Sequence, residues 1–266
     1  DSFRISKKEG RKAYQENGYL ASFARFADPA TLLQEADETA LIQAIRSLAP
    51  VVIVDESHHA TSDLSIEMLR NFNPSFVLDL TATPKSSSNV LVYVDAAQLK
   101  RENMVKLPVI VYNRKTHSDV FLDAITIRDK LEVQAKTAQA NGGRYIRPIV
   151  LFQAQPRGKD ENTTFLKLRS ELIEMGIPKD WIAIKTAEMN ELRNVDLLSE
   201  ACPIRYIITV NALKEGWDCP FAYVLATIAN RTSSVDVEQI LGRILRLPYT
   251  AKNPVNMLNI SYVLTS

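Results

Sequence analysis

Short apolar runs alternate with helix-like stretches along this 266-residue chain, and the alternation restricts the fold more than any other feature. Val51, Val52, Ile53 and Val54 form a β-branched run directly after Pro50, which predicts a strand buried on both faces. A second apolar run covers 76–80, with a helix-like stretch at 62–72 between the two. Strands that alternate with helices form parallel sheets, so the sequence predicts an α/β fold.

The same alternation resumes in the second half of the chain. Further strands are predicted at 90–94, 109–112, 149–153, 181–185, 206–210 and 224–228, and helices at 36–48, 116–140, 163–175, 196–201 and 235–245. A strong stop at Asn141, Gly142 and Gly143 separates the long charged helix from the next predicted strand. We expect two parallel-sheet domains, 1–108 and 109–266, with the boundary between Gln98 and Lys115.

Charge and cysteine content narrow the class of protein. With 32 basic and 31 acidic residues the net charge is +1, so no overall field attracts nucleic acid and any such contact must be a local patch. Basic candidates for that patch are Lys85, Arg114, Lys115 and Arg157. Cys202 and Cys219 are too few for a disulfide framework and indicate a reducing compartment. No apolar run has membrane-spanning length and no signal peptide is evident, which predicts a cytoplasmic protein.

Two carboxylates, Asp55 and Glu56, follow the first predicted strand. Ligands of open α/β sheets gather at the carboxyl ends of the strands. A carboxylate there can hold the magnesium ion of a nucleotide, while its neighbour orients or deprotonates the attacking water. The plain alternative is an acidic loop that merely follows a core strand.

A pair of hydroxyls, Thr81 and Thr83, comes directly after the second strand, in the sequence Thr-Ala-Thr-Pro. Such short side chains can bond the acidic pair or nearby backbone. An ordinary turn would also favour Thr and Pro at these positions.

A turn with Gly216, Trp217 and Asp218 follows the strand at 206–210. Gly216 permits an unusual backbone conformation or a close approach to a ligand. Asp218 can accept a hydrogen bond from a ribose hydroxyl or from an arginine. The alternative is a surface turn with Trp217 packed beneath it.

Four residues near 240 share one helical neighbourhood: Gln239, Gly242, Arg243 and Arg246. Guanidinium groups match phosphate geometry and can stabilise a phosphoryl group in transfer. Glycine inside a helix costs about 1 kcal/mol relative to alanine, so Gly242 asks for a reason such as close packing. The alternative is an amphipathic helix with two solvated arginines.

The four groups, in this order, resemble motifs II, III, V and VI of the superfamily-two DExH helicases and translocases. Three segments are most similar to the Res subunit of type III restriction enzymes: VVIVDESHH, LKRENMVKLPVIV and ALKEGWDCP. The resemblance spans residues 50–247. It implies two RecA-like domains, the first truncated at its N-terminal side, with ATP hydrolysed in the cleft between them.

The resemblance also implies a role for each motif residue. Asp55 would hold Mg²⁺ through water and Glu56 would act on the hydrolytic water. His58 would couple the acidic motif to Gln239, and Thr81 and Thr83 would link nucleotide state to domain movement. Gly216 and Asp218 would border the ribose and phosphates, with Gln239 and Gly242 also in the nucleotide site. Arg243 and Arg246 would reach the γ-phosphate.

ATP and Mg²⁺ are the cofactors this implies. DNA is the expected track, with RNA left open, and a methyltransferase modification subunit is a candidate partner.

The chain departs from the family pattern in two places. No phosphate loop with the pattern G-x-x-x-x-G-K followed by Ser or Thr occurs, and Ile240 stands where many relatives carry a second arginine. We therefore expect a fragment that binds ATP poorly alone and derives from an ATP-hydrolysing parent. Two alternatives stay open: a repair or phage-defence helicase without a nuclease, and a non-catalytic helicase-like scaffold that binds nucleic acid.

Overall fold

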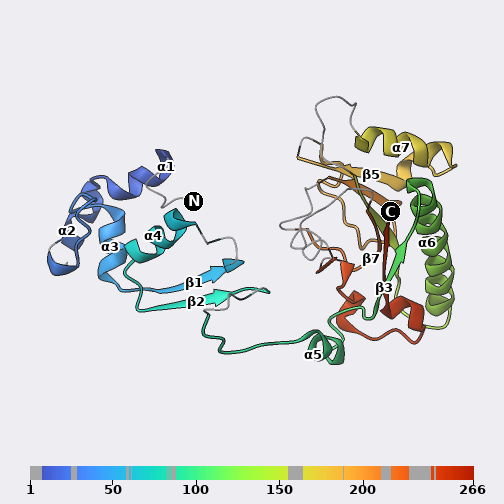
Figure 1. The fold of residues 1–266 in the computed structure, drawn as a ribbon, viewed down its shortest axis with the longest axis horizontal. Helices are drawn as coiled ribbons and strands as arrows, with labels where there is room; N and C mark the ends of the chain where they lie inside the picture. The colour runs from blue at the N-terminus through green and yellow to red at the C-terminus, as the bar shows by residue number, and fades with distance from the viewer. Residues whose placement is uncertain are drawn as a thin grey trace. The chain divides into compact units, whose positions relative to one another are not determined.

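The computed structural model divides the chain into two compact units, Asp1–Tyr93 and Val94–Ser266 (Figure 1). It describes residues 8–24, 29–57, 60, 62–82, 84, 88–154, 164–187, 189–210, 217–227, 241, 242 and 244–266. The expected division into domains 1–108 and 109–266 stays a prediction.

The first unit combines short helices with two strands. Its elements are α1 Lys8–Arg11, α2 Ala21–Ala24, α3 Leu41–Ser47, β1 Val51–Asp55, α4 Asp63–Asn71 and β2 Phe76–Leu80, with 3₁₀ turns at Lys12–Tyr14, Gly18–Leu20 and Pro29–Thr31. A small core forms around Tyr14, Ala40 and Ile42. The helix expected from residue 36 begins only at Leu41, because Ala40 is extended and the Gln43 amide binds the loop before it.

β1 and β2 pair in parallel, in register from Val51 opposite Phe76 to Asp55 opposite Leu80. The crossover helix α4 begins where the Ser62 hydroxyl accepts from the Ser65 amide. The parallel strand is thus confirmed, but its expected burial on both faces is wrong.

Val51 and Ile53 keep 63% and 62% of their surface exposed. In the described part of this unit β1 and β2 form a two-stranded sheet, so β1 has too few neighbours to bury its side chains.

The second unit is built on a six-stranded sheet in the order β3-β8-β7-β4-β6-β5, and every pair in it is parallel. Its strands are β3 Val109–Asn113, β4 Ile149–Gln153, β5 Ile182–Lys185, β6 Tyr206–Thr209, β7 Ala222–Thr227 and β8 Ser261–Thr265, and its helices α5 Ala96–Arg101, α6 His117–Ala140 and α7 Thr164–Glu174. Short 3₁₀ turns lie at Lys179–Trp181, Pro248–Thr250 and Asn256–Asn259. The predicted α/β fold with parallel sheets is confirmed.

Three details of the second unit differ from expectation. β8 was not predicted, although it is the central link between β3 and β7. The run 90–94 is not a strand; it is coil with exposed side chains. Residues 196–201 form turns in place of the expected helix.

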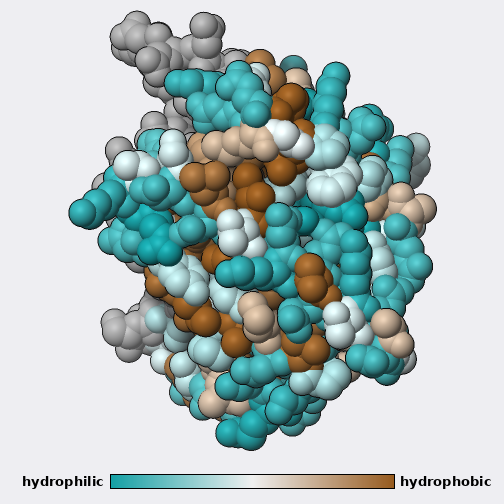
Figure 2. Space-filling view, turned by 90° about the vertical axis from the view of Figure 1, so that its right-hand side faces the viewer, coloured by the Kyte–Doolittle hydropathy of each residue, from teal (hydrophilic) through white to brown (hydrophobic). Residues whose placement is uncertain are grey.

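The long helix α6 runs along one face of the six-stranded sheet (Figure 1). The Thr116 hydroxyl caps its first turn, and Val120, Phe121 and Leu131 point into the core. The Phe121 ring meets Phe152 of β4 edge to face, with centroids 5.5 Å apart. Figure 2 looks from the side on which α6 lies: hydrophilic side chains predominate there, and hydrophobic ones gather in separate patches.

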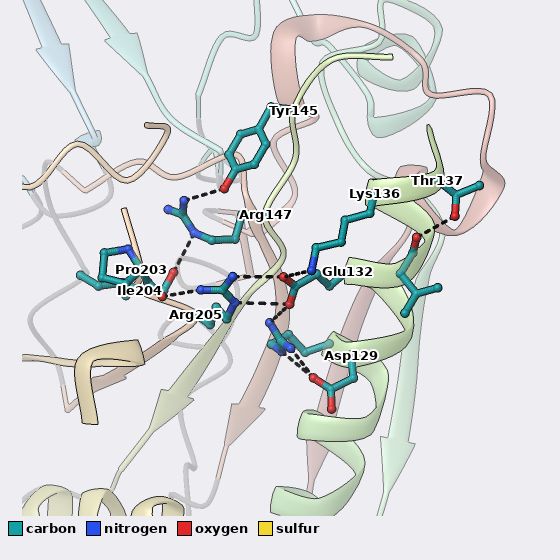
Figure 3. A network of polar contacts seen from close by, with 11 residues as sticks. Asp129, Glu132, Lys136, Thr137, Tyr145, Arg147, Pro203, Ile204 and Arg205 are labelled. Carbon is teal, nitrogen blue, oxygen red and sulfur yellow. Dashed lines mark hydrogen bonds and ion pairs between the residues drawn. The ribbon is translucent and has the colours of Figure 1, made fainter. Parts of the chain in front are cut away.

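A charged network joins α6 to the start of β6 (Figure 3). Glu132 accepts from Arg205 at 3.1 and 3.3 Å, from Lys136 at 3.2 Å and from Arg128. The Arg205 guanidinium also lies 4.0 Å from the centre of the Trp181 ring. Burial alone would raise the pKa of Glu132, but hydrogen bonding to Arg205 and the charge of Arg128 outweigh it and lower the pKa to about 2.

Cys202 and Cys219 are both free and buried, as expected for a protein without a disulfide framework. Within the described ranges, no helix is both long and apolar enough to cross a membrane.

Candidate active site

In the first unit, the acidic and hydroxyl motifs meet at one end of the sheet. Asp55 ends β1 opposite Leu80, which ends β2. Glu56 and Thr81 are therefore the first residues beyond the paired strands, on the same edge. Parallel pairing brings the carboxyl ends together, so motifs 25 residues apart in sequence become neighbours.

Glu56 has a positive φ, which the sequence pattern did not predict. Its φ is 51°, in the left-handed region that costs non-glycine residues roughly 1–2 kcal/mol. The Glu56 amide donates to Asp55 Oδ1 at 3.0 Å, which closes the turn, and both side chains are exposed. Such strain is typical of functional positions, where the surrounding structure holds a side chain in a required direction.

The donor chemistry at this edge fits a hydrated magnesium ion. Mg²⁺ prefers oxygen ligands and keeps several of its waters, so one or two carboxylates suffice. Asp55 offers an exposed carboxylate at the carboxyl end of a parallel strand. The Asp55 carboxylate would thus hold the ion, and the neighbouring Glu56 would face its water shell.

In the second unit, two predicted site residues are in direct contact. Arg246 Nη1 lies 2.5 Å from Asp218 Oδ2, and the two side chains are 60% and 44% exposed. Trp217 packs against the core and Cys219 is fully buried, so Asp218 lies on the outward side of this turn. The alternative considered for this turn, a surface turn with Trp217 packed beneath it, agrees with this placement.

A Cβ built on the backbone of Gly242 would meet no described atom within 4 Å. Residues 228–240 and 243 lie outside the described residues, so the expectation that close packing explains this glycine stays a prediction.

Several predicted residues lie outside the described residues. These are His58, Thr83, Gly216, Gln239 and Arg243 of the motifs, and Lys85 and Arg157 of the basic candidates. Of the other two basic candidates, Lys115 is exposed, whereas Arg114 is ion-paired to Asp123 and lies over the Tyr112 ring.

Two buried groups beside the Asp218–Arg246 pair escaped the sequence reasoning. Burial raises the pKa of the Cys219 thiol to about 11, opposed by hydrogen bonds to the Phe221 and Ala222 backbone and by the charge of Lys106. Cys219 therefore stays protonated and is no nucleophile at neutral pH. Lys106 is completely buried, and only its apolar neighbours Val105 and Leu107 hint at this in the sequence.

These observations define a class first: an α/β protein with parallel sheets, with carboxylates at a strand end in one unit and an arginine beside an aspartate in the other. Comparison with known families matches part of the chain. Residues 6–86 match the family described as "Type III restriction enzyme, res subunit". The predicted resemblance is thereby confirmed over the segment that carries Asp55, Glu56 and Thr81. Among curated proteins, none matches the chain.

Solved structures similar to this chain include restriction enzymes and an RNA-bound protein. The chain is 16% identical to the "ATP-dependent Type ISP restriction-modification enzyme LlaBIII bound to DNA", with a TM-score of 0.47, over 84% of this chain and 19% of that one. It is 20% identical to a fragment of a putative HsdR subunit of a type I restriction enzyme from Vibrio vulnificus, with a TM-score of 0.48, over 81% and 43%. It is 13% identical to S. cerevisiae Dbp5 L327V bound to RNA and ADP BeF3, with a TM-score of 0.44. That similarity covers 81% of this chain and 52% of the Dbp5 chain. The chain thus spans about half or less of the length of each.

Proposed function

We propose that this chain is the motor portion of an ATP-dependent DNA translocase or helicase, derived from the Res subunit of a type III restriction enzyme. The observation that carries the proposal is the contact between Asp218 and Arg246, 2.5 Å apart. Two motifs identified separately in the sequence supply an arginine and an acidic partner to one place. The family match over 6–86 supports the acidic half of the site.

Each residue then has a chemical task in ATP hydrolysis. Asp55 holds the hydrated metal ion that accompanies the nucleotide, which neutralises phosphate charge when bound. Glu56, presented by its strained backbone, orients the attacking water and accepts its proton. Asp218 receives a ribose hydroxyl, and Arg246 and Arg243 stabilise the charge on the transferred phosphoryl group. Thr81 and Thr83 couple nucleotide state to domain movement, and His58, Gly216, Gln239 and Gly242 complete the nucleotide site.

The partner chemistry follows from the same proposal. A track of DNA, or of RNA, is held through its phosphates, which gives binding that depends on salt and little on sequence. The protein acts in the cytoplasm, and a methyltransferase subunit is its candidate partner. This fragment alone is proposed to hydrolyse ATP poorly, since the phosphate-loop pattern is not in its sequence.

The test is nucleic-acid-stimulated ATP hydrolysis by the full-length parent protein. Glu56→Gln is expected to lower kcat by about 10²–10⁴-fold with little change in nucleic-acid affinity. Glu67→Gln, at an exposed position on α4, is the matched control and should retain full activity. Wild-type activity in Glu56→Gln would refute the role of this carboxylate. A parent that binds nucleic acid but never hydrolyses ATP would favour the scaffold alternative.

A further inference from the structure

The segment that follows α5 pairs with the backbone around Arg246. The Lys106 amide donates to the Leu245 carbonyl at 2.5 Å, and the Leu247 amide donates to the Met104 carbonyl at 3.0 Å. Between these two bonds, Val105 lies opposite Arg246 in an antiparallel bridge. The backbone of Arg246 is thus held in a short two-stranded ladder by a segment 140 residues away in sequence.

The Lys106 side chain also binds the backbone of this region. Its ammonium donates to three backbone carbonyls, those of Pro220, Ala222 and Arg246, each at 2.8 Å. Burial lowers the pKa of Lys106 to about 7, opposed by its interactions with Cys219 and with the charge of Asp218. The protonated side chain has three donors, one for each of the three carbonyls. It also lies 4.2 Å from the centre of the Tyr223 ring, a favourable place for a cation. Burial of a charge is costly unless it is fully bonded, and this side chain is completely buried.

The three carbonyls belong to the two segments that carry the Asp218–Arg246 pair. One belongs to Arg246 itself, and another to Pro220, two residues after Asp218. The single ammonium therefore fixes the backbone that carries the guanidinium relative to the backbone that carries the carboxylate. The buried Ser261 hydroxyl adds a bond to the Ile244 carbonyl at 3.2 Å in the same region.

We propose that Lys106 is a positioning residue for the guanidinium of Arg246, which it holds beside Asp218 by binding the backbone of both motifs. This inference rests on the proposed function of Arg246 in nucleotide hydrolysis. The structure offers a matched comparison in Arg147, a second buried cation bound by backbone carbonyls. Its backbone acceptors are Leu197, Ser199 and Ile204, and it also donates to the Tyr145 hydroxyl at 3.0 Å; none of these residues is close to Asp218 or Arg246 in sequence.

The experiment uses the full-length parent with the variants Lys106→Met, Arg147→Met and Arg246→Gln. The readouts are thermal unfolding, and kcat and KM for ATP at a temperature well below every unfolding midpoint. Both Met variants should unfold at a lower temperature, since each leaves buried carbonyls without a donor. Only Lys106→Met should also lower kcat, by at least tenfold, with KM changed less than threefold. When Arg246→Gln is added to Lys106→Met, kcat should fall by less than a further fivefold, because the guanidinium is already misplaced.

A second measurement reads the geometry directly. Amide exchange at Leu247 should become at least tenfold faster in Lys106→Met and stay unchanged in Arg147→Met, relative to the Ile207 amide in the sheet core. If Lys106→Met fails to fold, Lys106→Gln retains two of the three donors and should show the same pattern with smaller effects. Full kcat in Lys106→Met or Lys106→Gln, or an equal loss in Arg147→Met, overturns the inference while the role of Arg246 survives. Full kcat in Arg246→Gln overturns the proposed role of Arg246, and the inference with it.

Discussion

Arg246 Nη1 and Asp218 Oδ2 lie 2.5 Å apart, across 28 residues of sequence. The guanidinium thus has a carboxylate partner in this structure. If Arg246 binds phosphate as proposed, the phosphate must compete with Asp218 for the guanidinium.

The first prediction concerns Asp218→Asn in the parent protein. The pair is largely exposed, so its loss should change the free energy of unfolding by less than about 1 kcal/mol. KM for ATP should rise, by about tenfold, because the carboxylate no longer binds the ribose. Asp180→Asn, at an exposed position after Pro178, should change neither quantity. An unchanged KM in Asp218→Asn would remove this residue from the nucleotide site.

The second prediction concerns Glu132→Gln and the pH dependence of stability. The pKa of Glu132 is lowered from 4.5 to about 2 in the folded protein, so the folded state binds its proton less readily than the unfolded state does. This stabilisation is fully present above pH 4.5 and is lost as the pH falls toward 2. At pH 7 the variant should lose about 3 kcal/mol of unfolding free energy.

Urea unfolding of the 266-residue chain at several pH values measures this loss. The difference between wild type and Glu132→Gln should shrink steadily below pH 4.5. Glu174→Gln, exposed at the end of α7, is the control and should show no such trend. A difference that is the same at pH 3 and pH 7 would contradict the network's contribution.

The third prediction separates stability from activity at Gly242. Because a Cβ there meets no described atom, Gly242→Ala should leave the fold intact and add up to about 1 kcal/mol from helix propensity. If the space serves a ligand, the same variant of the parent should bind nucleotide more weakly. A Cβ at Gly18 in the first unit likewise meets nothing within 4 Å, so Gly18→Ala is the control and should bind nucleotide as tightly as wild type. Tight nucleotide binding by Gly242→Ala would leave this glycine without a functional reason.

The fourth prediction compares two Ile→Thr substitutions in strands of the 266-residue chain. Ile53 on β1 is 62% exposed, so its replacement should cost less than about 1 kcal/mol. Ile208 on β6 is fully buried, and Thr there loses apolar contacts and buries a hydroxyl, at a cost of about 2–4 kcal/mol. Similar losses at the two positions, measured by chemical unfolding, would show that β1 is buried after all.

Sequence patterns located most strands, because apolar runs of four or five residues bounded by turns are too short for helices and mostly form strands. β4 and β6 were predicted to within one residue, and so were the bounds of α6. The burial of Val51–Val54 was overstated, since a β-branched run indicates a strand but not how many strands pair beside it. β8 was missed because the short run at 261–265 is not followed by a helix-like stretch that would mark it as one more strand of the alternating pattern.

The candidate site was predictable only in its residue types. Motif order suggested Asp218 and Arg246, but their contact depends on how the turn at Trp217 packs, which is a tertiary property. The sequence motif at Glu56 did not predict its positive φ, and the burial of Lys106 depends on carbonyls more than 100 residues away in sequence. The assignment of separate roles to His58, Gln239 and Arg243 stays a prediction.

The proposed function requires the carboxylate of Glu56 and the guanidinium of Arg246 to act on one nucleotide in one step. Single-turnover ATP hydrolysis by the parent, with saturating DNA, tests it through Glu56→Gln, Arg246→Gln and the double variant. We predict that each single variant slows hydrolysis by about 10³-fold, and that the double variant is less than about tenfold slower than the worse single one, as for groups that work as a unit. Two losses that multiply in the double variant, or a single variant that hydrolyses ATP at the wild-type rate, would contradict the account.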